Sequence, residues 1–207
     1  MDSGFLITSF VTLFVVIDPL GLIPLFIALT RGMAPDHRRA VGLRACVIAA
    51  ILLTLFGLFG QKLLDFVGIS MPAFRIAGGI LLFLTALDML FERRTQRREG
   101  QIPDADHDPS VFPLAMPLIA GPGALAAMIL LVGQSGPGLQ GTAVVLGLML
   151  AVILLIYVLF LAAGPIERAL GRTGTMVITR LLGMLLAALS VQFVIDGIIG
   201  TGLVATL

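Results

Sequence analysis

The chain has 207 residues, of which 58% are hydrophobic and 12% charged, with a formal net charge of +1. Soluble domains average about 45–50% apolar and about 25% charged residues, so water is not the main solvent of this chain. The small net charge argues against a nucleic-acid partner. Cys46, the single cysteine, lies in an apolar stretch and both histidines lie in polar segments, so we expect no metal site.

Six long stretches of the chain are almost free of charge. About 20 such residues are the length that a helix needs to cross a hydrocarbon core about 30 Å thick. The predicted spans are 5–30, 41–66, 71–91, 111–133, 141–163 and 177–200. They predict an all-α integral membrane protein with six transmembrane helices and no soluble domain.

The first span contains DPLGLIP, from Asp18 to Pro24, near its middle. Pro19 and Pro24 each lack a backbone N–H and clash with the preceding turn, so the helix is expected to break or kink here. A carboxylate at this depth costs on the order of 3 kcal/mol, so Asp18 should face the bundle interior, pair with another group or be protonated. Two roles stay open: a ligand for a substrate ammonium or a proton, or a cap on the half-helix that starts at Pro19.

The segment 92–110 is charged and contains proline, which predicts a flexible linker between a first half, 1–91, and a second half, 111–207. Ten of the thirteen Lys and Arg residues flank the first, third and fifth connections, whereas Lys62 alone flanks the second. Basic residues mark the cytoplasmic side of a membrane protein. The linker is therefore expected to be cytoplasmic, and both termini are expected outside, on the periplasmic side.

The second half repeats features of the first. Residues 17–21 match 120–124, residues 59–60 match 163–164, and residues 75–78 match 180–183, at offsets of 103, 104 and 105. Because each half has an odd number of spans, the two copies must run in opposite directions. We therefore predict two inverted three-helix repeats with helices 1 and 4 discontinuous, an arrangement that places a substrate site near the midplane in secondary transporters.

The break predicted in the fourth span is Gly121-Pro122-Gly123. Amides at the N-terminus of a half-helix attract a carboxylate, and carbonyls at the opposite end attract a cation. The predicted substrate-binding residues come from the two breaks and are Asp18, Pro19, Leu20, Gly21, Gly121, Pro122, Gly123 and Ala124. The alternative is an ordinary packing kink at each place, since Gly and Pro are frequent in membrane helices.

Arg75 and Arg180 are candidates for gating or coupling, each in an R-x-x-G run near the start of the last helix of its half. Each is expected to pair with a carboxylate such as Asp18, Asp88 or Asp196. The alternative is that the guanidinium reaches the lipid headgroups.

Gln192 and Asp196 are the other candidates for gating or coupling, because their i,i+4 spacing places them on one helix face. We expect Gln192 to hydrogen-bond another helix, whereas Asp196 lies near the outer end, where plain solvent exposure is the alternative. Glycines at 78, 79, 183 and 197 are expected to let helices pack closely.

Four segments of the chain resemble the MarC family of membrane proteins, which includes small neutral amino acid transporters of the SnatA type. They are IDPLGLIPLF at 17–26, AGGILLF at 77–83, PLAMPLIAGPG at 113–123 and QFVIDGI at 192–198. The resemblance implies transport of glycine, alanine and similar amino acids across the bacterial inner membrane, coupled to an ion gradient of H⁺ or Na⁺. One position departs from the family: many members carry Asn where this chain has Leu22.

The leading hypothesis is a secondary transporter of small neutral amino acids that works by alternating access and needs no resident cofactor. An exporter of another small metabolite or drug is the alternative within transport, and a non-transporting scaffold or assembly protein is the alternative outside it. No catalytic motif is present, so an enzyme is not expected. The expected partners are amino acids and the lipid bilayer; the oligomeric state is left open, a homo-oligomer included.

Overall fold

The computed structural model describes residues 3–91, 108–136 and 138–202. These residues form helices and short connections and contain no strand. Five helices are long and apolar enough to cross a membrane, and a bent pair of helices makes a sixth span if it is counted as one. The prediction of an all-helical membrane protein is therefore confirmed, whereas most of the predicted linker, residues 92–107, lies outside the described residues.

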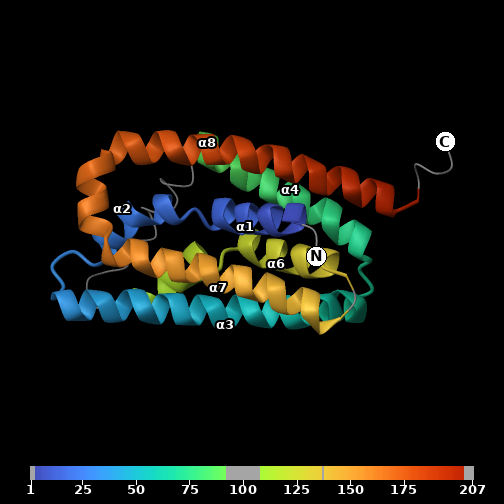
Figure 1. Ribbon diagram of the computed structural model, residues 1–207, viewed down its shortest axis with the longest axis horizontal. Coiled ribbons are helices and arrows are strands. Elements are labelled where there is room, and N and C mark those ends of the chain that lie inside the picture. Colours follow the sequence, from blue (N-terminus) through green and yellow to red (C-terminus); the bar gives the residue numbers. More distant parts are fainter. Residues whose placement is uncertain (1–2, 92–107, 137, 203–207) are drawn as a thin grey trace.

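The helices lie side by side in one elongated bundle (Figure 1). In chain order they are α1 (Ser3–Ile17), α2 (Pro19–Leu29), α3 (Pro35–Val67), α4 (Met71–Leu90), η1 (Ser110–Ile119), α6 (Pro122–Gln134), α7 (Leu139–Leu161) and α8 (Ala163–Gly200). The segment η1 is a π-helical stretch whose backbone is non-helical at Phe112 and Met116. The last 28 residues of α8, Thr173–Gly200, form its membrane span, after a non-helical backbone at Gly171.

The observed helices contain the predicted spans with small changes at their ends. One difference is at the second span, which was placed from residue 41, whereas α3 begins at Pro35. Proline is favoured at the first helical position and an acidic residue, here Asp36, is favoured in the first turn. These local signals extend the helix beyond its apolar stretch.

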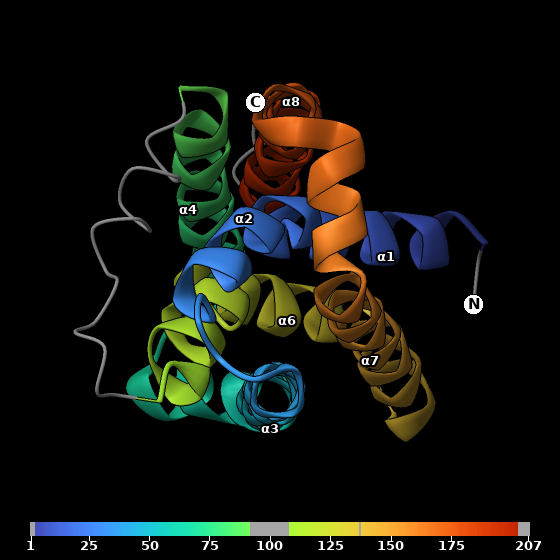
Figure 2. The same ribbon diagram turned by 90° about the vertical axis from the view of Figure 1, so that its left-hand side faces the viewer.

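Three pairs of helices define the bundle: α4 packs along α8, α3 along α7, and α1 against α6 (Figure 2). Helices α4 and α8 approach each other closely, because a Cβ added to Gly79 would lie 2.8 Å from the carbonyl oxygen of Ser190 and 2.8 Å from Cγ2 of Val194. Gly197 of α8 faces Pro72 and Ile76 of α4 in the same way. The predicted role of these glycines in close packing is confirmed.

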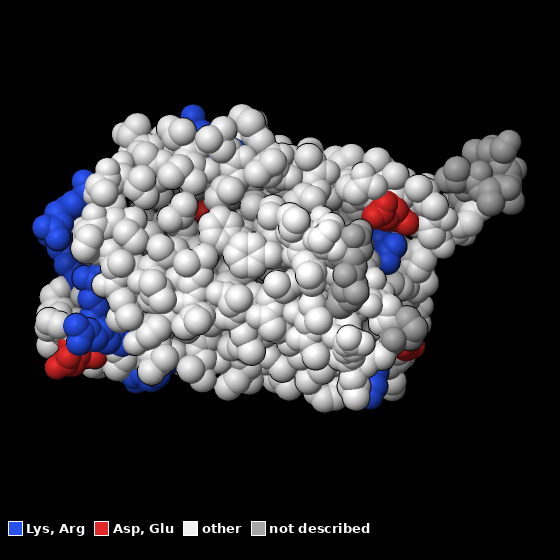
Figure 3. Space-filling view, viewed as in Figure 1, with Lys and Arg blue, Asp and Glu red and all other residues white. Residues whose placement is uncertain are grey.

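Basic side chains gather at one end of the bundle (Figure 3). This end holds the connection between α2 and α3, the first turns of α3 and the start of α8, whereas α1 begins and α8 ends toward the other end (Figure 1). We call it the basic end. The long faces between the two ends carry exposed apolar side chains such as Ile51, Leu84 and Leu154, which suits contact with lipid.

Gly79→Ala is expected to destabilise the protein, because the new methyl group meets a backbone oxygen that cannot move aside. Overpacking of this kind typically costs about 1–3 kcal/mol. Gly147→Ala is the matched control, since a Cβ there meets nothing within 4 Å. Thermal unfolding of the purified protein in detergent should show a lower midpoint for Gly79→Ala only; equal midpoints for the two variants would contradict the packing described here.

Candidate functional site

The first helix break consists of a single residue, Asp18, between the end of α1 and the start of α2. Its backbone is left-handed, with φ 59° and ψ 65°, a conformation that Asp and Asn adopt more readily than most residues. The residue is 1% exposed, and its Oδ1 accepts a hydrogen bond from the amide of Gly21 at 3.1 Å. Asp18 is therefore the N-cap of α2, with Pro19 in the first helical position.

Gly21 fits closely against this cap. A Cβ added to Gly21 would overlap the Asp18 carboxylate, so the residue must lack a side chain for the cap to form. The second proline of the motif behaves differently from the prediction, because α2 continues through Pro24 to Leu29. The expected break at Pro24 is wrong: its fixed φ is compatible with a helix, and only one intrahelical donor is missing there.

The Asp18 carboxylate also receives a hydrogen bond from α8. The hydroxyl of Thr179 donates to Asp18 Oδ1 at 3.4 Å, which joins residues 161 positions apart in the chain. Thr179 was missed in the sequence, because a lone threonine in an apolar helix usually bonds to its own backbone and gives no signal. The carboxylate thus connects the break to the last helix.

The second break lies between η1 and α6, whose axes are bent by 54°. Gly121 is the N-cap of α6 and has an extended backbone, with φ −75° and ψ 168°, and it makes no side-chain cap. A Cβ added to Gly123 would lie 3.3 Å from Val16 Cγ1 and 3.3 Å from Thr85 Oγ1. Because Val16 precedes Asp18 by only two residues, the first turn of α6 lies beside the first break.

The predicted site residues of the two breaks are not equally enclosed. Asp18, Pro19, Gly123 and Ala124 are buried, Leu20, Gly21 and Gly121 are half-buried, and Pro122 is exposed. One break therefore presents a carboxylate that already accepts two hydrogen bonds, and the other presents amides of the first turn of α6 that no side chain caps. The two sides of the site differ in charge.

Ser9 and Thr12 of α1 are two further polar residues that sequence reasoning missed. Both are fully buried, and neither hydroxyl has a hydrogen-bond partner among the described residues. They are three positions apart and so share one face of the helix, between its start and the first break. Buried polar groups in native proteins are nearly always hydrogen-bonded, so unpaired hydroxyls point to contact with water or a solute.

Two of the contacts considered for the gating residues are not found among the described residues. Arg75 is half-buried and forms no ion pair with any described residue, and its Nε is buried without a partner. Gln192 does not bond another helix: its Nε2 donates to Oδ1 of Asp196 at 2.7 Å, because the carboxylate lies one turn further along the same exposed face. Arg180 is exposed on α8. The gating roles of all four residues stay predictions.

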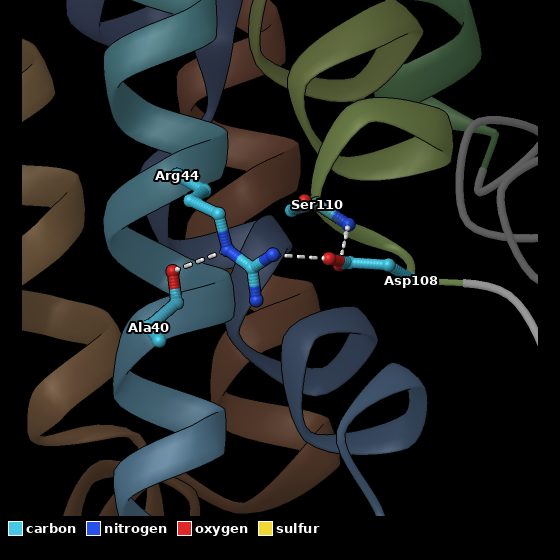
Figure 4. A network of polar contacts seen from close by, with 4 residues as sticks. All are labelled: Ala40, Arg44, Asp108 and Ser110. Carbon is cyan, nitrogen blue, oxygen red and sulfur yellow. Dashed lines mark hydrogen bonds and ion pairs between the residues drawn. The ribbon is translucent and has the colours of Figure 1, made fainter.

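An ion pair joins α3 to the segment that leads into η1 (Figure 4). Arg44 Nη1 lies 2.6 Å from Asp108 Oδ2, and the amide of Ser110 donates to Asp108 Oδ1 at 3.0 Å. Partial burial raises the pKa of Asp108, but the hydrogen bonds from Ser110 and the charges of Arg44 and His37 lower it by more. The pKa of Asp108 is therefore below its usual value.

The Arg44–Asp108 pair is expected to stabilise the fold only while Asp108 is ionised. Because folding lowers the pKa, this stabilisation is complete above the unfolded value, about 4, and is lost as the pH falls through the lower folded value. A double-mutant cycle of Arg44→Gln and Asp108→Asn should give a coupling of up to about 1 kcal/mol at pH 7. Thermal unfolding at pH 7 and pH 3 measures it; a coupling that does not weaken at pH 3 contradicts the assignment.

The cap makes a separate prediction about stability. Asp18→Ala removes the acceptor and places alanine in a left-handed backbone, whereas Asp18→Asn keeps an acceptor and a residue that tolerates this conformation. Asp18→Ala should therefore be less stable than Asp18→Asn by about 1–2 kcal/mol. Unfolding midpoints in detergent compare the two variants, and equal midpoints would show that the cap adds nothing to stability.

These features define a helical integral membrane protein with a buried carboxylate at a helix break in its core. The chain belongs to the MarC family of integral membrane proteins, whose family model matches residues 3–201. The predicted family is therefore confirmed.

Three relatives illustrate the extent of the similarity. The chain is 41% identical over 199 residues to a UPF0056 membrane protein of Archaeoglobus fulgidus, covering 94% of this chain and 92% of the relative. It is 36% identical to the membrane protein YvbG of Bacillus subtilis, over 98% and 96% of the two chains. It is 37% identical to the inner membrane protein YhgN of Escherichia coli, over 93% and 95%. No solved structure matches the chain.

Proposed function

We propose that the protein is a secondary transporter that moves a small zwitterion of the glycine or alanine type across the bacterial inner membrane by alternating access. The observation that carries the proposal is the position of Asp18: a buried carboxylate at a helix break, beside the uncapped first turn of α6. A zwitterion has one cationic and one anionic group, and the two breaks offer a complementary group to each.

The proposed contacts follow from the chemistry of the two breaks. The ammonium group of the substrate binds the Asp18 carboxylate, displacing the Thr179 hydroxyl, whose hydrogen bond at 3.4 Å is long. The carboxylate of the substrate binds the amides at Gly123 and Ala124, at the N-terminus of a 13-residue helix. Val16 and Thr85 lie close to Gly123, which restricts the site to a short substrate side chain.

The two unpaired hydroxyls of α1 support a polar route to this site. Thr12 lies six residues before Asp18, which is about 9 Å along the helix at about 1.5 Å per residue. Ser9 lies one turn further toward the end opposite the basic end (Figure 1). In this proposal the hydroxyls contact the substrate, water or the coupling ion, H⁺ or Na⁺, between that end and the break.

The pairing of helices supports the inverted-repeat hypothesis. Each span of the first half contacts its proposed counterpart in the second: the first span contacts the fourth through α1 and α6, the second contacts the fifth through α3 and α7, and the third contacts the sixth through α4 and α8. We infer two inverted repeats with discontinuous first and fourth spans, which rock against each other around the breaks. The basic end is assigned to the cytoplasm, and both termini to the periplasmic side.

A flux assay with labelled alanine in proteoliposomes tests the proposal. Asp18→Asn, which preserves the cap, should lower the rate at least about tenfold, because an ion pair with the ammonium is lost. Gly123→Leu should have a similar effect by filling the site, whereas Gly147→Leu, at an exposed position with open space, is the matched control.

The same assay separates the alternatives. Wild-type flux in both Asp18→Asn and Gly123→Leu would show that the site lies elsewhere. Saturable flux of another metabolite or drug, with no competition by alanine or glycine, would favour an exporter of a different substrate. The absence of any saturable flux, together with a stable co-purifying protein, would favour a scaffold.

A further inference from the structure

A cavity lies at the basic end of the bundle, away from the helix breaks. Its volume is about 240 Å³, and it is enclosed by α2, the first turns of α3, the end of α7 and the start of α8. The side chains that matter here are Phe26, Arg38, Arg39, Tyr157 and Phe160. None of the described residues that line the cavity is acidic, and Arg38, Arg39 and Tyr157 bring hydrogen-bond donors to it.

Arg38 is the unusual residue of this cavity. Its guanidinium lies over the ring of Phe26, with Cζ 5.1 Å from the ring centroid. Its Nε and Nη2 are buried and have no hydrogen-bond partner among the described residues. Leaving charged donors buried and unpaired is costly, which points to a ligand that the protein itself does not supply.

The neighbouring arginines differ in this respect. Arg39 lies 3.6 Å from the carboxylate of Asp36, and Arg44 is paired with Asp108 at 2.6 Å. A carboxylate is therefore within reach of each of these two arginines, whereas no carboxylate of the described part of the chain pairs with Arg38. The Nε–H and one Nη2–H of a guanidinium lie along the same edge and point the same way, which matches two oxygens of one carboxylate or phosphate group.

Two aromatic rings form the floor of the cavity and hold the guanidinium in place. The rings of Phe26 and Phe160 are stacked, with centroids 4.1 Å apart and planes 5° from parallel. Both are nearly fully buried, and Gly42 packs against them, since a Cβ there would lie 3.4–3.5 Å from ring carbons of each. Phe26 follows Asp18 by eight residues, about 12 Å along the helix, so the cavity is distinct from the site at the breaks.

We propose that this cavity is an oxyanion-binding site, in which Nε–H and Nη2–H of Arg38 donate to two oxygens of one phosphate or carboxylate group. Tyr157 and Arg39 line the same cavity and provide further donors. The anion comes either from the aqueous solution or from the headgroup of an anionic lipid, because the basic end lies at the level of the headgroups. The inference is independent of the transport function proposed above.

Binding is tested on the full chain purified in an uncharged detergent, at constant ionic strength. The probes are inorganic phosphate, acetate and short-chain phosphatidylglycerol, with short-chain phosphatidylcholine as the neutral lipid, and the readout is the saturable rise of the unfolding midpoint. Response to phosphate or acetate identifies a free anion as the ligand. Response to phosphatidylglycerol alone identifies a lipid headgroup, and either result supports the site.

Two substitutions of Arg38 locate the binding. Arg38→Gln should weaken anion binding at least about tenfold. Arg38→Lys keeps the charge but loses the two parallel donors of the guanidinium, and it should weaken binding by about fivefold. Arg31→Gln is the matched control, because Arg31 is an exposed arginine before α3 that does not line the cavity, and it should change anion binding less than about threefold. Equal losses in Arg38→Gln and Arg31→Gln, wild-type affinity in Arg38→Lys, or no saturable response to any anionic probe would each overturn the proposal. Alanine flux is measured separately, so failure of one proposal does not decide the other.

Discussion

The constraint on which this structure depends is that a chain in hydrocarbon must satisfy its own backbone hydrogen bonds. A break in a membrane helix leaves amides without partners unless another group accepts from them. At Asp18 the chain supplies that group itself, because the carboxylate accepts from the amide of Gly21. The missing side chain of Gly21 is a requirement of this hydrogen bond, because a Cβ there would overlap the carboxylate.

The second break meets the same constraint in a different way. Gly121 and Pro122 turn the chain sharply before α6 without supplying any side-chain acceptor, so the first amides of α6 keep their capacity to bind an anion. Val16 brings this turn next to the first break. The core therefore contains the Asp18 carboxylate beside backbone amides of α6 that no side chain caps. The proposed function follows from this pairing of an acidic group with hydrogen-bond donors.

The basic end of the bundle also contains buried donors without a partner among the described residues, here on the positively charged Arg38. Arg38 lies over the ring of Phe26, which stacks on Phe160 and so joins α2 to α7, and no acidic side chain of the described residues pairs with it, whereas Arg39 and Arg44 each lie near a carboxylate. The unpaired N–H donors of Arg38 and the uncapped amides of α6 both favour anionic ligands. The two proposals together place anion-binding groups at two depths, about 12 Å or more apart along the helix axis.

The sequence by itself determined the six spans, the break at Asp18 and the segregation of the arginines, because each depends on local composition or on one backbone property. It also predicted the close packing at glycines such as Gly79. Only the tertiary structure decided that Thr179 reaches Asp18, that α2 continues through Pro24, and that Arg38 lines a cavity. The hydrogen bond and the cavity join residues far apart in the chain. The apolar sequence around each residue predicts that its side chain is buried, but not which distant residue it contacts.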